Sequence, residues 1–253
     1  MREQIDTIPV NDAFLSGDEC PFCFMERQAE QSAIRFTLGP SASYMEPEVR
    51  GITNRTGFCG IHLKKMYDYG NSLGSAMILQ THLESILDGL QDQLDNYTLP
   101  EKKPLFSLKK QAPAQEDPLV TYIRSRTGSC FICDKIDYNL TRYYHTFFYL
   151  LREPEFRRRV EDSKGFCLRH FARLMELAPD KLPDRQRDWF YATVLPLMRQ
   201  NLQRVKEDID WFVAKYDYRN AGAPWKNSRD AVSRTMEKLQ GLHPADPPYK
   251  QDG

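Results

Sequence analysis

Every cysteine of this 253-residue chain belongs to a short motif that could ligate a metal ion. Two Cys-x-x-Cys motifs occur, in "ECPFC" and "SCFIC", and each is followed by a Cys-x-x-His motif, in "TGFCGIH" and "KGFCLRH". Three thiolates and one imidazole, in pairs separated by two residues, are typical ligands of tetrahedral structural zinc. The eight candidate ligands are Cys20, Cys23, Cys59, His62, Cys130, Cys133, Cys167 and His170.

The motifs appear in the same order in two halves of the chain. The Cys-x-x-Cys motifs are 110 residues apart, the Cys-x-x-His motifs are 108 residues apart, and "EPEVR" in the first half corresponds to "EPEFR" in the second. This spacing indicates an internal duplication with one metal site in each half. The first site would contain Cys20, Cys23, Cys59 and His62. The second would contain Cys130, Cys133, Cys167 and His170. A site that draws one pair from each half is the alternative.

Zinc is the expected metal, with two ions per chain. An iron–sulfur cluster is the alternative, because thiolates suit it and a histidine can replace a cysteine. Four protein ligands leave no position for a substrate water, so a zinc hydrolase is not expected. A disulfide framework would leave one of three cysteines unpaired in each half. A thioredoxin-like role lacks the βαβ surroundings of such motifs.

The segments around the ligand pairs predict helices throughout. Residues 24–38 read as a helix that Gly39-Pro40 cannot continue. Apolar residues recur at spacings of three and four in 63–94 and in 198–216, with Pro196 expected near a kink or break. The ligand pairs therefore lie at or just before helix starts, where the partial positive charge favours thiolate.

The expected fold is all-α, with two tandem-duplicated helical units that are each tied by a Cys3His site. The first unit would be 1–97 and the second 119–218. Residues 98–118, with four prolines and little apolar content, read as a linker. Residues 219–253 would form a short helix, ended by Gly241, and a loose tail.

Several segments together carry a resemblance to a known family: "IDTIPVNDAF", "ECPFCFMERQ", "LGPSASYMEPEVR", "NRTGFCGIHLKKMYDYGNSLG" and "MILQTHLE". The chain resembles an uncharacterised family of bacterial proteins, a domain of unknown function, built on paired Cys-x-x-Cys and Cys-x-x-His motifs. The likeness extends over most of the chain and is most specific across residues 5–85. It implies a bacterial cytoplasmic protein with a metal-binding helical fold, and no particular activity.

Composition limits the class of protein. With 41% hydrophobic and 12% aromatic residues, the chain can build one large or two small cores. Its 35 Lys and Arg balance 35 Asp and Glu, so net charge does not direct it to nucleic acid or to an anionic membrane. No signal-peptide core or run of roughly 20 apolar residues is evident. We expect a cytoplasmic protein with reduced thiols.

A few other residues are candidates for function. His82 and His145 read as edge-of-core histidines, with a ligand or catalytic role as the alternative. Glu26 could accept a hydrogen bond from a metal-bound imidazole. A basic patch near the second Cys-x-x-His motif could touch nucleic acid or an acidic partner, although a solvated face is the simpler interpretation. The patch consists of Arg157, Arg158, Arg159, Lys164, Arg169 and Arg173.

Three functional hypotheses follow. The favoured one is a non-enzymatic zinc protein whose two sites stabilise a helical scaffold for protein interaction or regulation. The second is an iron–sulfur or thiol redox protein. The third is a zinc-supported nucleic-acid binder that uses the basic patch. No arrangement of residues typical of a catalytic site stands out, so an enzyme is not expected.

Overall fold

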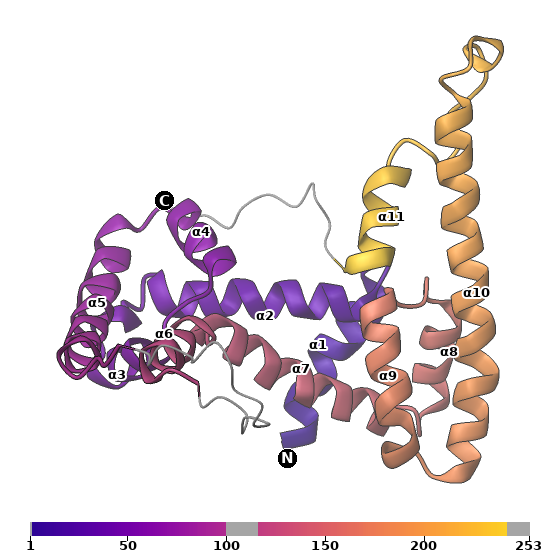
Figure 1. Cartoon of the computed structure of the whole chain (residues 1–253). Coiled ribbons are helices and arrows are strands. Elements are labelled where there is room, and N and C mark those ends of the chain that lie inside the picture. The colour runs from indigo at the N-terminus through magenta and orange to yellow at the C-terminus, as the bar shows by residue number, and fades with distance from the viewer. Residues whose placement is uncertain (1, 100–115, 242–253) are drawn as a thin grey trace, which may run out of the picture. The chain divides into compact units, whose positions relative to one another are not determined.

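The computed structural model of the protein describes residues 2–99 and 116–241. These residues form α-helices and two short 3-10 helices and contain no strand, which confirms the all-α prediction (Figure 1). None of the described helices is long and apolar enough to cross a membrane. In chain order the helices are α1 (Arg2–Leu15), α2 (Pro21–Leu38), η1 (Ser43–Met45), α3 (Pro47–Thr56), α4 (Gly60–Tyr69), α5 (Ser72–Asp95), α6 (Pro118–Thr127), α7 (Phe131–Leu150), α8 (Pro154–Asp162), α9 (Leu168–Lys181), α10 (Asp184–Ala214), η2 (Tyr218–Asn220) and α11 (Ala231–Gln240).

The chain forms two compact units, and each takes segments from both halves of the sequence. In the described part of the chain, unit 1 contains residues 2–29 and 136–241, and unit 2 contains residues 30–99 and 116–135. Helices α2 and α7 each contribute residues to both units. The units therefore do not coincide with the sequence repeats at 1–97 and 119–218. Most of the expected linker, and the expected loose tail, lie outside the described residues.

An aromatic cluster forms the core of unit 1. Its ring centroids lie between 4.4 and 6.4 Å apart, in stacked, tilted and edge-to-face arrangements that favour aromatic packing. Two members belong to the ligand motifs: Phe22 lies between Cys20 and Cys23, and Phe166 precedes Cys167. Burial of these two rings fixes the backbone that carries the cysteines. The cluster consists of Phe14, Phe22, Tyr144, Phe147, Phe156, Phe166 and Phe190.

Unit 2 is built around α5, which packs against α3, η1 and α6. The sequence predicts one continuous helix after His62, but the structure contains two, α4 and α5. Gly70 ends α4 in the left-handed region (φ 97°), and the Asn71 side chain then accepts a hydrogen bond from the Gly74 N–H (2.9 Å). The Gly-Asn pair thus acts as a helix stop followed by a helix start.

The structure confirms the predicted helix starts at all four ligand pairs. Helices α2 and α7 begin directly after Cys20 and Cys130, and Cys59 and Cys167 are the N-cap residues of α4 and α9. The predicted short C-terminal helix is also present as α11, ended by Gly241 with φ 80°. Helix α10 continues through Pro196, so no break occurs there.

Candidate metal centres

The eight predicted ligands come together in two Cys3His groups, and the grouping corrects the prediction from the sequence. Each group combines the Cys-x-x-Cys pair of one repeat with the Cys-x-x-His pair of the other. The expected sites within each repeat are therefore wrong, and the alternative of one pair from each half is what the structure contains. Cluster 1 consists of Cys20, Cys23, Cys167 and His170. Cluster 2 consists of Cys59, His62, Cys130 and Cys133.

In cluster 1, which belongs to unit 1, the cysteine sulfurs surround Nδ1 of His170. Cys20 Sγ, Cys23 Sγ and Cys167 Sγ lie 3.5, 3.4 and 3.2 Å from this nitrogen. The Sγ atoms of Cys23 and Cys167 are 3.6 Å apart. All four side chains are buried.

In cluster 2, which belongs to unit 2, the same arrangement is centred on His62. Cys59 Sγ, Cys130 Sγ and Cys133 Sγ lie 3.3, 3.2 and 3.4 Å from its Nδ1 atom. The Sγ atoms of Cys59 and Cys133 are 4.0 Å apart. Cys59 and Cys133 are half-buried, whereas Cys130 and His62 are buried.

These separations fit the edges of a zinc tetrahedron. Zn–S bonds of about 2.3 Å and Zn–N bonds of about 2.0–2.1 Å place two sulfurs about 3.8 Å apart and a sulfur and a nitrogen about 3.6 Å apart. The observed sulfur–nitrogen distances, 3.2–3.5 Å, and sulfur–sulfur distances, 3.6 and 4.0 Å, lie close to these values. Each cluster can therefore surround a single ion.

A glycine two residues before each Cys-x-x-His cysteine shapes the loop that presents it. Gly57 and Gly165 have positive φ angles of 60° and 73°, which other residues rarely adopt. The Gly57 carbonyl accepts a hydrogen bond from the Phe131 N–H (2.9 Å). This bond ties the loop before Cys59 to the start of α7 beside Cys130, and so brings the two ligand pairs of cluster 2 together.

The protein groups alone favour one imidazolium–thiolate pair in each cluster and not the ionisation of all its thiols. The hydrogen bond with Cys167 raises the pKa of Cys23, and burial raises the pKa of Cys133. Burial opposes a charge on His62, but hydrogen bonds with Cys130 and Glu30 raise its pKa to about 10. Burial raises the pKa of the Cys130 thiol, but the hydrogen bond with His62 outweighs it and brings this pKa to about 6. Burial also opposes a charge on His170, but contacts with Cys167 and Cys20 raise its pKa to about 10. A bound cation would displace the imidazole protons, so proton release would accompany metal binding.

Carboxylates from α2 lie next to the second nitrogen of each histidine. Glu30 Oε1 lies 3.0 Å from His62 Nε2, and Glu30 Oε2 accepts from Lys65 Nζ at 2.5 Å. A carboxylate that accepts from Nε2–H holds the imidazole with Nδ1 toward the metal. No motif in the sequence singles out Glu30, because it lies 32 residues from His62.

Glu26 lies near His170 but does not accept the predicted hydrogen bond from its imidazole. Its Oε2 atom lies 3.6 Å from His170 Nε2, beyond hydrogen-bonding distance, and its carboxylate pairs with Arg169 instead. His170 Nε2 is buried and has no hydrogen-bond partner among the described residues. The two histidines therefore differ in how firmly the protein holds them.

Helix α11 covers cluster 1. A methyl group added at Gly241 would lie 3.2 Å from Cys23 Sγ and 3.3 Å from Cys167 Sγ, which is closer than ordinary contact, and the φ angle of 80° also favours glycine at this position. The Lys238 side chain, 1% exposed, donates to the backbone carbonyls of Glu19 and Lys164. Its ammonium group anchors the helix to the chain on both sides of the cluster.

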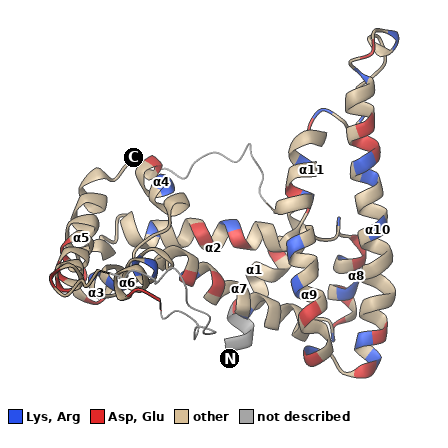
Figure 2. Ribbon diagram, in the orientation of Figure 1, with Lys and Arg blue, Asp and Glu red and all other residues tan. Residues whose placement is uncertain are grey.

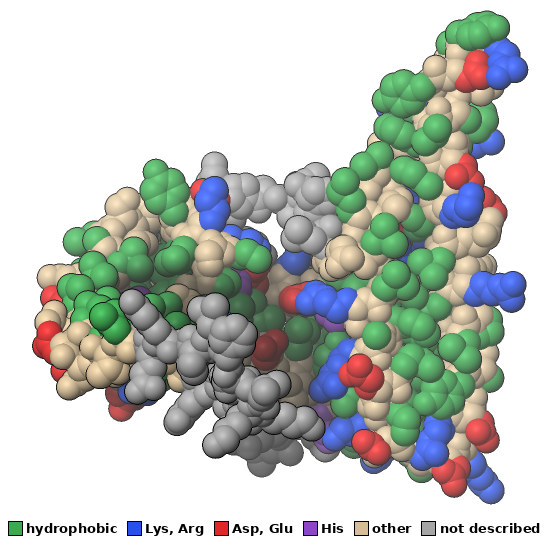
Figure 3. All heavy atoms as spheres, in the orientation of Figure 1, with side chains coloured by type: hydrophobic (Ala, Val, Ile, Leu, Met, Phe, Trp, Pro, Cys, Tyr) green, Lys and Arg blue, Asp and Glu red, His purple; other side chains and the backbone are tan. Residues whose placement is uncertain are grey.

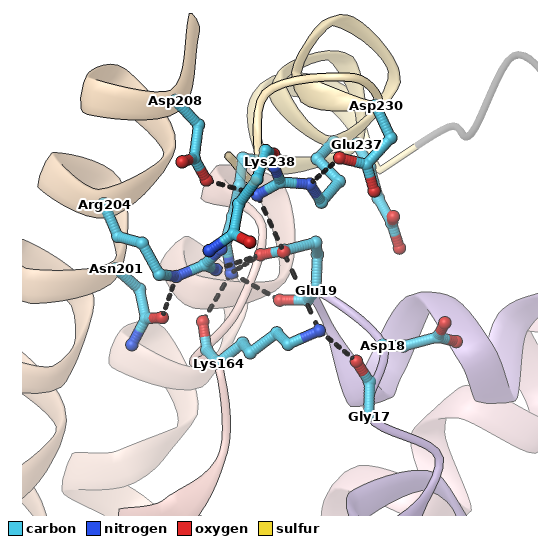
Figure 4. Close-up of polar contacts among 12 residues, drawn as sticks. Gly17, Asp18, Glu19, Lys164, Asn201, Arg204, Asp208, Asp230, Glu237 and Lys238 are labelled. Atoms are coloured by element: carbon cyan, nitrogen blue, oxygen red, sulfur yellow. Dashed lines mark hydrogen bonds and ion pairs between the residues drawn. The ribbon is translucent and has the colours of Figure 1, made fainter. Parts of the chain in front are cut away.

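An ionic network next to Cys20 completes this attachment (Figure 4). Glu19 is 3% exposed, and its Oε2 atom accepts from Arg204 at 2.5 Å and faces Lys238 Nζ at 3.3 Å. Burial raises the pKa of Glu19, but Arg204 and Lys238 outweigh it and lower the pKa below its usual value. Arg234 of α11 joins the network through Asp208 of α10 (2.8 Å). The network borders a polar cavity of about 550 Å³.

The remaining candidates have ordinary structural surroundings. His82 lies 3.1 Å from the Asn54 carbonyl, as a histidine at the edge of a core would. The same prediction for His145 is wrong, because this side chain is exposed. Five of the six side chains in the basic patch interact with neighbouring carboxylates, carbonyls or amides. Acidic residues also occur among the basic residues of α9 and α10 (Figure 2). The patch is therefore not a continuous positive surface for a nucleic-acid backbone.

The model of a family of unknown function, DUF6062, matches residues 1–246 of the chain. The chain belongs to this family. Comparisons with curated proteins and with solved structures gave no match.

Proposed function

We propose that this DUF6062 protein binds two zinc ions and that these ions stabilise a non-enzymatic helical scaffold for protein interaction. The observation that carries the proposal is the presence of two Cys3His groups. Within each group, the four ligand atoms lie within 4.8 Å of one another. Cluster 1 would hold one ion and cluster 2 the other. Zinc bound by three thiolates and an imidazole has all four positions filled, as in structural sites.

The role of each ion would be to join segments that are far apart in the chain. In cluster 1 the ion would link the start of α2 to the start of α9, and in cluster 2 the start of α4 to the start of α7. Structural zinc in small peptides contributes about 10–16 kcal/mol of apparent binding free energy near pH 7. A contribution of that size is comparable to the stability of an ordinary domain.

The ligand spacing argues against an iron–sulfur cluster, and the contacts of the basic patch argue against nucleic-acid binding. An iron–sulfur cluster distributes its protein ligands over two or more iron atoms, whereas these groups close around one position. The nucleic-acid alternative depends on the basic patch, whose side chains are mostly paired with acidic or carbonyl groups. Within residues 2–99 and 116–241, neither an iron–sulfur cluster nor nucleic-acid binding has a structural feature in its favour.

Metal analysis of protein expressed without added metal tests the proposal. We expect two zinc ions per chain and a colourless protein, and one zinc in each of the double variants Cys20→Ser/Cys23→Ser and Cys130→Ser/Cys133→Ser. Iron with stoichiometric sulfide, or fewer than one metal ion per wild-type chain, would overturn it. Unchanged zinc in both variants would overturn the assignment of the ligands.

A further inference from the structure

Helix α5 presents a row of leucines to solvent. Leu79, Leu83, Leu87 and Leu94 are 39%, 56%, 55% and 51% exposed. They recur at spacings of four, four and seven residues, so they lie along one side of the helix. Figure 3 shows hydrophobic side chains gathered on the surface over α4 and α5. Helix α5 packs against α3 and α6 through another side, on which His82 lies 3.1 Å from the Asn54 carbonyl and Ser85 accepts from Arg126, so the leucine row is not needed for the core of unit 2.

A row of carboxylates lies on the adjoining flank of α5. Glu84, Asp88 and Asp95 each follow one leucine of the row by one residue, which places them about 100° round the helix from it. Glu84, Asp88, Asp92 and Asp95 follow one another at spacings of four, four and three residues, and α5 contains no Lys or Arg. No ion pair within the described part of the chain reaches Glu84, Asp88 or Asp92. Like charges four residues apart destabilise a helix by about 0.2–0.5 kcal/mol per pair, and acids near its C-terminus oppose the helix dipole. The acidic row therefore weakens the isolated helix.

We propose that this face of α5, the leucine row together with the acidic row, is a docking surface for a basic amphipathic helix of a partner protein. Such a helix would lay an apolar stripe on the leucines and place Lys or Arg against the carboxylates. The exposed leucines, and the carboxylates that form no ion pair with the described residues, would then both be matched. The inference deepens the proposed scaffold role by naming the surface and the chemistry of its partner.

Charge argues against a second copy of the same helix as the occupant. Two α5 helices joined through their leucines would bring acidic rows together without a single Lys or Arg on either helix to offset them. Like charges at a helix interface act against association. A partner with the opposite charge is the complementary choice.

The test uses two synthetic helical peptides with the same leucine stripe, one flanked by lysines and the other by glutamates. Binding to the full-length protein is measured by fluorescence anisotropy over a range of salt concentrations. We expect the lysine peptide to bind at least about tenfold more tightly than the glutamate peptide, and its affinity to fall as salt rises. Equal affinities, or no binding by either peptide, would overturn the proposal.

Matched variants locate the surface. The change Glu84→Gln/Asp88→Asn removes two charges from the acidic row and should weaken binding of the lysine peptide about tenfold. The control Glu46→Gln/Glu48→Gln removes two exposed charges at the start of α3, in the same unit, and should leave binding unchanged. Equal effects of the two doubles would mean that general charge, and not the α5 face, attracts the peptide.

The leucines are tested by Leu83→Ser/Leu87→Ser, which should abolish binding while helix content and metal stoichiometry stay at wild-type values. Retained binding would contradict the proposal. Sedimentation would also contradict the proposal if the wild type formed a dimer and the variant Leu83→Ser/Leu87→Ser remained a monomer. Metal content is measured on the same samples, so that the docking proposal and the zinc proposal can fail separately. If the protein holds no zinc, the difference in affinity between the two peptides would still test the docking surface.

Discussion

Glu26 and Glu30 lie one turn apart on α2, and each approaches the histidine of a different cluster. Only Glu30 is within hydrogen-bonding distance of its histidine, at 3.0 Å, whereas Glu26 lies 3.6 Å from His170 and pairs with Arg169. A carboxylate that accepts from a ligating imidazole fixes its orientation and increases its basicity. The two glutamates therefore form a natural comparison.

We expect Glu30→Gln to weaken zinc binding at cluster 2 by about 10–100-fold, since the neutral amide is a poorer acceptor for His62 Nε2–H. Glu26→Gln should change the affinity of cluster 1 much less. Competitive titration with a chromophoric chelator measures both affinities in protein that carries the two sites. Comparable losses in the two variants would show that the 3.0 Å contact has no special role.

The ligands also differ in their access to solvent. Cys59 and Cys133 of cluster 2 are half-buried, whereas all four ligands of cluster 1 are buried beneath Gly241. We expect a chelator to remove metal from cluster 2 first. A thiol-alkylating reagent added during chelation should then label Cys59 and Cys133 before Cys20 or Cys167, as mass spectrometry of the peptides can follow. Simultaneous labelling of both clusters would contradict this order.

At the scale of elements, the loop before α4 depends on one glycine. Gly57 has φ 60° and ψ −155°, a conformation essentially restricted to glycine, and a methyl group there would lie 2.8 Å from the His82 ring. Gly57→Ala should reduce the free energy of unfolding by about 1–3 kcal/mol. Gly60→Ala is the control, because a methyl group at Gly60 meets nothing within 4 Å and alanine favours the helix. Denaturant titration of both variants measures the difference, and similar midpoints would refute the argument.

The attachment of α11 depends on a buried ammonium group. Lys238→Met would leave two carbonyls without their donor and take one cation from Glu19, at a cost of about 3 kcal/mol. Lys206→Met, which removes an exposed ion pair with Asp210, should cost less than about 0.5 kcal/mol. Thermal unfolding compares the two. A small effect of Lys238→Met would mean that the ion pair with Arg204 alone is enough to stabilise the buried Glu19 carboxylate.

Most elements could be predicted from the sequence because their signals are local. Gly39-Pro40 marks the C-terminal end of the helix after Cys23, which ends at Leu38 in the structure. The motifs likewise mark the four helix starts at the ligand pairs. The division between α4 and α5 also had a local signal, in Gly70 followed by Asn71, but the apolar spacing concealed it. Glu30 could not be found in this way, because its contact with His62 depends on how distant helices pack.

At the scale of the whole molecule, the pairing of the ligand motifs could not be predicted from spacing. Within a repeat, 35 residues separate Cys23 from Cys59, whereas 70 separate Cys59 from Cys130 and 143 separate Cys23 from Cys167. Each doubling of a loop adds only about 0.6 kcal/mol of closure entropy. Joining distant pairs thus costs about 1 kcal/mol more, which the packing of one aromatic side chain offsets. Proximity in sequence is therefore a weak guide to which pairs share a metal.

The crossed pairing gives a specific expectation for how the protein loosens when one site is lost. Cys59→Ser should reduce hydrogen-exchange protection in residues 30–99 and 116–135, which form unit 2, and His170→Ala should reduce it in residues 2–29 and 136–241, which form unit 1. The reason is that each ion would join segments within one unit, and local opening follows such cooperative units. A strong chelator should lower protection in both units and reduce the melting temperature. Hydrogen exchange mapped by mass spectrometry tests this expectation. If Cys59→Ser lost protection only in the contiguous half 1–97, the result would support metal sites within each repeat and contradict the crossed arrangement.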